Sequence, residues 1–170
     1  MEFKELAKKR YSCRKFSSKK VEKEKIEQII EAGIDAPTAV NKQPFKIFMI
    51  DSEKAKEDLK NYTRFTFGAD VFLLLGYKEE EGWIREFDKH NFAQVDASIA
   101  ATHIMMEISD LGLATTWVGH FDEPSLKEKY PQMKGYKLIA LFPIGYAAED
   151  DVPSNKHFER KSKKDIVEVI

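Results

Sequence analysis

The chain has 170 residues, of which 42% are hydrophobic and 12% aromatic. This length and apolar content predict one compact domain over residues 1–170 and exclude a disordered chain. The net charge of −1 disfavours a nucleic-acid-binding domain, because such domains are usually strongly basic. The one cysteine, Cys13, excludes a disulfide scaffold and a zinc site built from cysteines.

Positive charge gathers at both ends of the chain. Residues 1–20 contain eight Lys or Arg and two Asp or Glu, and residues 154–164 contain five and one. Neighbouring cations repel one another unless they are solvated or face an anion, and two short basic patches fit a small anion better than a nucleic acid. No signal peptide or membrane-spanning run is visible, so we expect a cytoplasmic protein.

The first half of the chain predicts alternating helices and strands. Residues 1–10 predict a short helix, and residues 21–33 a stronger one that ends at Gly33. "FKIFMI" (45–50) predicts a strand, and "EKAKEDLKNY" (53–62) predicts a helix with a polar face. "ADVFLLLGY" (69–77) is a continuous apolar run of the kind found in buried central strands.

The longest predicted helix covers residues 92–112 and ends at Gly112. Its middle is apolar on more than one face, so we expect burial on several sides, in part by a second subunit. "EPSLKEKY" (123–130) predicts a short helix, and "YKLIALFPIGY" (136–146) another buried strand. The chain ends in "IVEVI", which needs a surface to pack against. This order of elements predicts an α+β fold with helices covering a sheet.

Two loops contain candidate ligand-binding groups. In "APTAVNKQPF" (36–45), Thr38, Asn41 and Gln43 supply hydroxyl and amide groups between two prolines. They either face a flat polar ligand or simply face water in a helix-to-strand connection. In "GLATTWVGHFD" (112–122), small residues let the backbone approach a ligand closely, although a tryptophan such as Trp117 is more often part of the core.

Other chemistry finds little support in the sequence. The four histidines (90, 103, 120 and 157) lack the spacing of metal ligands, so we predict no metal site. No G-x-S-x-G, P-loop or G-x-G-x-x-G motif is present, which disfavours a hydrolase, a phosphotransferase and a Rossmann dehydrogenase. Cys13 either has a pKa lowered by the basic residues around it or fills space in the core, and the second is the commoner fate.

Taken together, these stretches resemble the nitroreductase family of flavin enzymes in order and spacing. "RYSCRKF" is similar to the family's Arg-x-Ser-x-Arg/Lys-x-Phe, and "APTAVNKQPF" to its Ala-Pro-Ser-x-x-Asn-x-Gln-Pro-Trp. "RKSKKDIV" resembles its Arg-Lys/Arg-x-Leu-x-x-Ile-Val tail. The departures are Thr38 for Ser, Phe45 for Trp and Lys163 for Leu. The chain is short for the family, so we expect it to lack a substrate-covering helical insertion.

The resemblance implies an intertwined homodimer with a central mixed or antiparallel sheet and FMN at the subunit interface. Arg10, Ser12 and Arg14 would grip the flavin, with Arg160 and Lys161 converging on its phosphate, although which of the two tail residues is the ligand stays open. The loop 36–45 would reach the flavin of the other subunit. The residues implied to bind the cofactor are Arg10, Tyr11, Ser12, Arg14, Pro37, Thr38, Asn41, Gln43, Trp117, Val118, Gly119, Arg160 and Lys161.

The implied activity is that of an FMN-dependent oxidoreductase. NADH or NADPH would pass hydride to the flavin, and a nitroaromatic, a quinone or a similar acceptor would remove the electrons. The flavin supplies the chemistry, so no catalytic side chain is predicted. Arg14, if it lies near the pyrimidine end, would stabilise the negative charge that reduction adds. Two alternatives stay open: a relative with another reaction, such as reductive dehalogenation, and a flavin-binding sensor or store without turnover.

Overall fold

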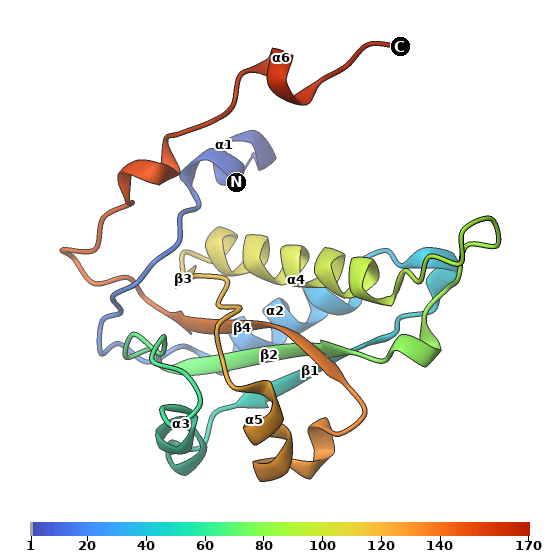
Figure 1. Ribbon diagram of the computed structural model, residues 1–170. Coiled ribbons are helices and arrows are strands. Elements are labelled where there is room, and N and C mark those ends of the chain that lie inside the picture. Colours follow the sequence, from blue (N-terminus) through green and yellow to red (C-terminus); the bar gives the residue numbers. More distant parts are fainter. Residues whose placement is uncertain (1) are drawn as a thin grey trace.

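The computed structural model describes residues 2–170 (Figure 1). The predicted elements appear in the predicted order, and a short strand at 114–115 and a short helix at 163–166 are present in addition. The helices are α1 (Phe3–Lys9), α2 (Lys23–Ile34), α3 (Glu53–Leu59), α4 (Ala93–Asp110), α5 (Glu123–Lys129) and α6 (Lys163–Ile166). The strands are β1 (Phe45–Ile50), β2 (Val71–Tyr77), β3 (Ala114–Thr115) and β4 (Lys137–Gly145). Short 3₁₀ helices cover Ala39–Asn41, Glu79–Glu81, Pro131–Met133 and Asn155–His157.

The four strands form one antiparallel sheet in the order β1-β2-β4-β3. Phe48 of β1 lies opposite Leu74 of β2, which in turn lies opposite Leu141 of β4. All seven residues of β2 are buried, and the strand has a neighbour on each side. The prediction of a buried central strand within an α+β fold is therefore confirmed.

The sheet is covered on both faces. Alternate residues of β2 point to opposite sides, as a strand requires. Leu73 and Leu75 join the core that α2 and α4 form on one face, and Phe72 and Leu74 join a second core on the other. Figure 1 shows α2 and α4 stacked over the sheet, with α3 and α5 beneath it. Each face of the sheet thus carries a hydrophobic core.

The contact between α2 and α4 depends on Gly33. The prediction that α2 ends at this glycine is wrong. Gly33 lies inside α2 and does not end it, because the helix continues to Ile34 and closes at Asp35. A Cβ at position 33 would lie 2.8 Å from side-chain atoms of Ile104. The glycine therefore allows the two helices to pack closely. Gly112, with φ of +74°, follows α4 as predicted, in a conformation that glycine adopts without strain.

The two ends of the chain are held differently. After α1 the chain runs in extended form beside β3 and β4: the Cys13 amide donates to the Thr115 carbonyl at 3.0 Å, and the Ser17 amide to that of Tyr146 at 2.8 Å. From Phe158 onward every residue is exposed. The C-terminal segment leaves the body and carries α6 past α1 (Figure 1). The apolar residues Ile166 and Val169 are 69% and 88% exposed, so "IVEVI" is not packed against any surface formed by residues 2–170.

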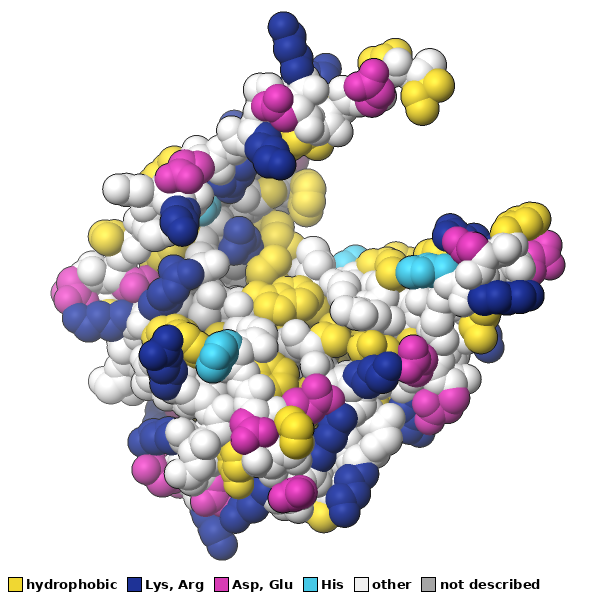
Figure 2. Space-filling view, viewed as in Figure 1, with side chains coloured by type: hydrophobic (Ala, Val, Ile, Leu, Met, Phe, Trp, Pro, Cys, Tyr) yellow, Lys and Arg dark blue, Asp and Glu magenta, His cyan; other side chains and the backbone are white. Residues whose placement is uncertain are grey.

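Helix α4 has both buried and exposed residues among the described residues 2–170. Its buried residues are Ala93, Asp96, Ala97, Ala100, Ala101, Ile104 and Ile108. On another side Thr102 and His103 are exposed, and together with Phe3, Ala7 and Met106 they line a groove of about 620 Å³. Figure 2 shows a deep hollow between the C-terminal arm and the body, with hydrophobic side chains on its inner surface. No helix within residues 2–170 has the length and hydropathy to cross a membrane.

Candidate functional site

The extended segment 10–14 presents its side chains alternately. Cys13 is fully buried, whereas Ser12 is half-buried and Arg14 is exposed on the other side. Ser12 pairs with Thr115, and a guanidinium N–H of Arg14 donates to the Ser12 carbonyl at 3.1 Å. The strand-like pairing of this segment with β3 therefore fixes where Ser12 and Arg14 project.

The thiol of Cys13 lies on the buried side of this segment. Burial raises the pKa of the Cys13 thiol to about 12, and the nearby Asp151 carboxyl adds to this effect. Burial and Asp151 also raise the pKa of Tyr11. The thiol therefore stays protonated at neutral pH. The space-filling interpretation of Cys13 holds, and the alternative of a thiol activated by neighbouring cations is wrong, because the desolvation outweighs the charge of Arg14.

Arg10 and Arg160 approach each other from opposite ends of the chain. Burial, together with the positive charge of Arg160, lowers the pKa of the Arg10 guanidinium. A ring contact of 6.5 Å between Tyr11 and His157 accompanies this approach. Arg160 donates to the carbonyls of His157 and Glu159 at 2.6 Å each, and Lys161 is exposed. Two neighbouring guanidinium groups favour an anion between them.

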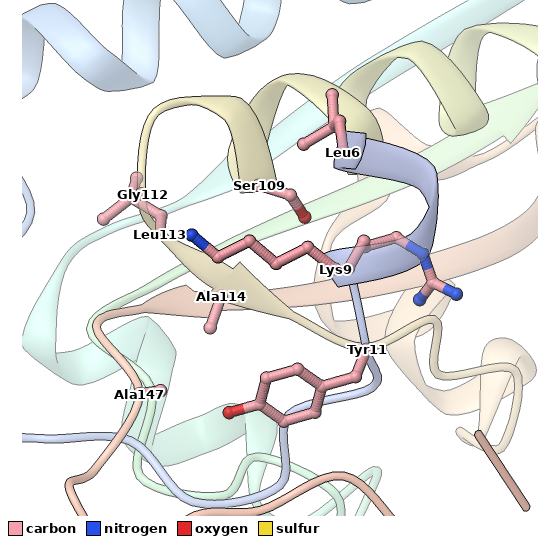
Figure 3. A pocket seen from close by; sticks show the side chains of 9 residues that line it. Leu6, Lys9, Tyr11, Ser109, Gly112, Leu113, Ala114 and Ala147 are labelled. Carbon is pink, nitrogen blue, oxygen red and sulfur yellow. The ribbon is translucent and has the colours of Figure 1, made fainter. Parts of the chain in front are cut away.

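A small hollow lies beside Arg10 where α1, the end of α4 and β3 meet. Its volume is about 190 Å³. Figure 3 shows the Lys9 side chain running across this hollow, with Ser109 of α4 on one side and the Tyr11 ring on the other. The hollow is thus bordered by the basic segment and by the backbone turn around Gly112.

A second hollow, of about 170 Å³, lies beside Arg14. The residues that line it are Arg14, Phe65, Phe67, Thr116, Trp117, Val118, Gly119 and His120. The amide and carbonyl of Val118 both bond to Leu141, at 3.0 and 2.9 Å, which fixes the turn against β4. The Val118 side chain is buried, and a Cβ at Gly119 would meet nothing within 4 Å.

Trp117 does not follow the commoner fate of a tryptophan. It is 38% exposed, although its ring packs edge-on against Phe142 at 5.4 Å and its indole N–H donates to the Ile139 carbonyl at 3.3 Å. The indole is therefore held in place at the surface of the second hollow. A planar ligand there would meet a fixed aromatic edge, the open backbone of Gly119 and the Arg14 guanidinium.

The loop between α2 and β1 has an unusual backbone. Val40, Asn41 and Gln43 all have positive φ, of 45°, 57° and 49°. Such conformations cost roughly 1–3 kcal/mol each and persist only where the surrounding structure holds them. The Gln43 amide donates to the Thr38 hydroxyl at 3.1 Å, and the Gln43 side chain donates to that of Asn41 at 2.9 Å. The three polar groups predicted to bind the flavin are therefore gathered in one closed turn.

Within one chain this loop does not lie beside the arginines. The Ala39 amide is bonded to Asp96 in the first turn of α4, whereas Arg10 lies beside Ser109, near the last turn. Helix α4 has 18 residues and is therefore about 27 Å long. The loop and Arg10 thus lie near opposite ends of α4.

Comparison with known proteins shows where this fold recurs. The family model described as the nitroreductase family matches residues 7–66 and 60–146. The chain belongs to the nitroreductase family. A nitroreductase family protein from Clostridium difficile 630 has 31% sequence identity and a TM-score of 0.90, with 99% of this chain and 98% of that chain covered. A curated Bacillus subtilis protein named "Putative NAD(P)H nitroreductase YdgI" is 26% identical, over 90% of this chain and 92% of its own length.

Nitroreductase family membership confirms the resemblance seen in the motifs, and the solved structures confirm the fold. A member of this fold from Exiguobacterium sibiricum 255-15 was solved in complex with FMN; it is 21% identical, with a TM-score of 0.83 over all of this chain and 98% of that one. The named relatives include a Staphylococcus aureus protein named "NADPH-dependent oxidoreductase", which is 27% identical. The matched region covers 67% of this chain and about half (51%) of that relative. These findings support an oxidoreductase of the nitroreductase family.

Several residues of the candidate site were not predicted from the sequence. Phe65, Phe67 and His120 line the second hollow with Arg14, and the aromatic pair in "RFTF" just before a buried strand was a signal that could have indicated them. Asp96 was also missed, although it is the only acidic residue in the apolar stretch from Phe92 to Met106. Within residues 2–170 no group of three or more His, Cys, Asp or Glu is placed to bind a metal ion.

Proposed function

We propose that the protein is an FMN-dependent oxidoreductase that works as a homodimer. NADH or NADPH delivers hydride, and a nitroaromatic, a quinone or a similar molecule accepts the electrons. The observation that carries the proposal is the contact of the two ends of the chain, where the rings of Tyr11 and His157 lie 6.5 Å apart and the Arg160 charge acts on Arg10. Ser12 and Arg14 follow in the same basic segment. The names of the relatives and the FMN complex of a structural neighbour support it.

The residues present fit FMN. Its phosphate carries about −1.5 to −2 charges at neutral pH, by analogy with other phosphomonoesters, and guanidinium forks bind phosphate oxygens in pairs. Arg10, Ser12 and Arg160 would hold the phosphate, with Tyr11 and Lys161 beside it. The turn at Trp117, Val118 and Gly119 has an open side on which a planar ring can lie, because nothing approaches the place of a Cβ at Gly119.

The homodimer would supply what one chain leaves incomplete. The groove beside α4 and the exposed apolar end of the tail have no partner surface within residues 2–170. Burial of each large apolar side chain contributes about 1.5–3 kcal/mol, so these surfaces together favour association. In such a dimer the loop with Pro37, Thr38, Asn41 and Gln43 would reach the flavin held mainly by the other subunit.

The protein's own part in the reaction is positioning and electrostatics. When bound, FMN accepts and returns hydride equivalents, and this chemistry belongs to the cofactor. Arg14 would stabilise the negative charge that reduction adds, because it is exposed toward the second hollow and carries a fixed positive charge. Trp117 and the aromatic residues Phe65 and Phe67 would border the place of the second substrate. No side chain is required as an acid or base.

The test starts from the flavin content of the purified protein. We expect a yellow protein whose flavin, released by denaturation, runs as FMN on chromatography. Under anaerobic conditions NADH or NADPH should bleach the flavin absorbance, and an added quinone or nitroaromatic should restore it within seconds. Reduction without reoxidation by any acceptor would favour a flavin sensor or store. A protein that binds no flavin under any condition would refute the proposal.

A further inference from the structure

Asp96 is a charged residue on a face of α4 that is otherwise apolar. The other buried residues of this helix are alanines and isoleucines, whereas Asp96 is a carboxylate that is only 2% exposed. Burying a carboxylate is costly unless hydrogen bonds or charges compensate it. Asp96 therefore needs a reason to occupy this position.

The hydrogen bonding of Asp96 points to the loop between α2 and β1. Oδ1 accepts the backbone N–H of Ala39 at 2.9 Å, and Oδ2 is buried without a hydrogen-bond partner among residues 2–170. The carboxylate lies in the first turn of α4, where the helix dipole favours negative charge. Its hydrogen bonding within the described chain is thus directed to the loop alone.

The loop needs such an anchor. Its bonds among Thr38, Asn41 and Gln43 close it on itself and do not tie it to the body of the domain. Val40 is 72% exposed and has φ of 45°, an unfavourable conformation for a β-branched residue. A hydrogen bond from a backbone N–H to a carboxylate is stronger than one to a neutral acceptor. The bond from Ala39 to Asp96 therefore joins a strained turn to a rigid helix.

We propose that Asp96 is a positioning residue that holds residues 38–43 in the conformation that presents Thr38, Asn41 and Gln43 to FMN. The identity of the ligand rests on the proposed function, whereas the holding of the loop does not. Without the carboxylate, the loop spends more time in open conformations, and the binding-competent form becomes a smaller fraction of the population. The apparent affinity for FMN falls in proportion to the fraction of molecules in the binding-competent form.

Lys42 provides a direct measure of loop opening. It is exposed and is followed by Gln43, so trypsin can cleave the bond when the loop opens locally. In the full-length chain freed of flavin, Asp96→Ala should raise the rate of cleavage after Lys42 by about tenfold, equivalent to about 1.4 kcal/mol. Cleavage after Lys161, in the exposed tail, should not change and serves as the internal reference. Mass spectrometry of the fragments distinguishes the two bonds.

Two further variants separate positioning from general stability. Asp96→Asn keeps an acceptor for the Ala39 N–H but loses the charge, so we expect a smaller increase of about threefold. Asp70→Ala is the matched control, because the largely buried Asp70 also accepts a backbone N–H, from Val21 at 2.8 Å. It should lower the thermal midpoint more than Asp96→Ala does, because Asp70 also bonds Lys20. It should leave cleavage after Lys42 unchanged.

Titration of the same proteins with FMN completes the test. We expect saturating FMN to slow cleavage after Lys42 in the wild type and in all three variants, because bound FMN favours the loop conformation that it contacts. Wild-type cleavage after Lys42 in Asp96→Ala would overturn the proposal; if that variant does not fold, wild-type cleavage in Asp96→Asn would do so. Faster cleavage in Asp96→Ala together with no protection of Lys42 by FMN in any of these proteins would overturn the link to the ligand. Failure of the wild type to bind FMN would refute the proposed function and leave the cleavage result standing.

Discussion

The segment 10–16 and the tail 158–170 bring positive charge to the same place, but the chain holds them in different ways. The first, the pinned segment, is paired through its backbone with β3 and with the residues that follow β4: the Lys15 carbonyl accepts the Ala148 amide at 3.0 Å. The tail is exposed throughout, and its order is local: Ser162 and Asp165 bond each other to cap α6. One half of the candidate phosphate site is therefore built by the domain itself. The other half depends on what the tail packs against.

The largest effect should come from removing the apolar end of the tail. Truncation after Ser162 keeps Arg160 but deletes Ile166, Val167, Val169 and Ile170, which are 47% to 117% exposed in the single chain. If a partner subunit buries them, each contributes roughly 1.5–3 kcal/mol to association. Sedimentation over a concentration series should show a dimer that dissociates at far higher concentration, with loss of flavin as a consequence.

The control for this truncation is the double variant Lys163→Gln and Lys164→Gln. It changes the charge of the tail and keeps its apolar end, so the dimer should persist. If the truncated protein dimerises as tightly as the wild type, the tail is a solvated end. The tail would then contribute its positive charge and would not contribute to dimerisation.

The next largest effect concerns the ligand. FMN should bind more tightly than riboflavin by several orders of magnitude, since charge-assisted hydrogen bonds contribute about 1.5–3 kcal/mol each and riboflavin has no phosphate to make them. Quenching of flavin fluorescence during titration of the flavin-free protein measures both affinities. Equal affinities would show that the cations at the two ends of the chain do not form a phosphate site.

Variants that remove the two arginines one at a time measure what each region contributes to FMN binding. Arg10→Ala should weaken FMN binding by about ten- to a hundredfold. Arg160→Ala should weaken it less, because Arg160 is exposed and its guanidinium already donates to two tail carbonyls. Lys54→Ala, on the exposed surface of α3, is the control and should change nothing. A larger effect of Arg160→Ala would mean that the tail, and not the pinned segment, is the main anchor.

The smallest effect concerns the buried side of the pinned segment. The pKa of Cys13 is raised to about 12 in the folded protein, whereas the pKa of a thiol in an unfolded chain is about 8.5. The contribution of this thiol to stability is therefore complete below about pH 8.5 and is lost as the pH rises toward 12. Cys13→Ala should remove this part of the alkaline loss in denaturant titrations. At pH 8 a thiol reagent should label wild-type Cys13 only after unfolding; rapid labelling of the native protein would contradict the burial.

Those parts of the fold that depend on local pattern could be predicted from sequence. The apolar run of β2 indicated a central strand, and Gly112 indicated the end of α4, because a buried strand and a left-handed cap each leave a local signature. The prediction that α2 ends at Gly33 was wrong because it also depended on a local pattern. A glycine near the end of a helical pattern suggests a stop, and only the packing of α2 against Ile104 shows why it lies inside the helix.

The parts of the site that depend on tertiary contacts could not be predicted. Nothing in "TAVNKQ" indicates that a valine takes a positive φ, because its intrinsic preference opposes that conformation. The role of Asp96 depends on which turn of α4 faces the loop, and the approach of Arg160 to Arg10 depends on the path of the tail. The motifs named the polar residues of the loop; the strain and the anchor that position them appear only in three dimensions.

The exposed indole of Trp117 gives the protein its own optical probe. This side chain lies at the surface of the second hollow and is held there by the Ile139 carbonyl, whereas the other tryptophan, Trp83, packs against Phe92 at 5.2 Å in a different part of the domain. Flavins absorb where tryptophan emits, so a flavin bound beside Trp117 would quench its fluorescence by energy transfer. Trp117→Phe would leave the signal of Trp83 as a reference. Arrival and departure of the cofactor could then be followed in real time without any added label.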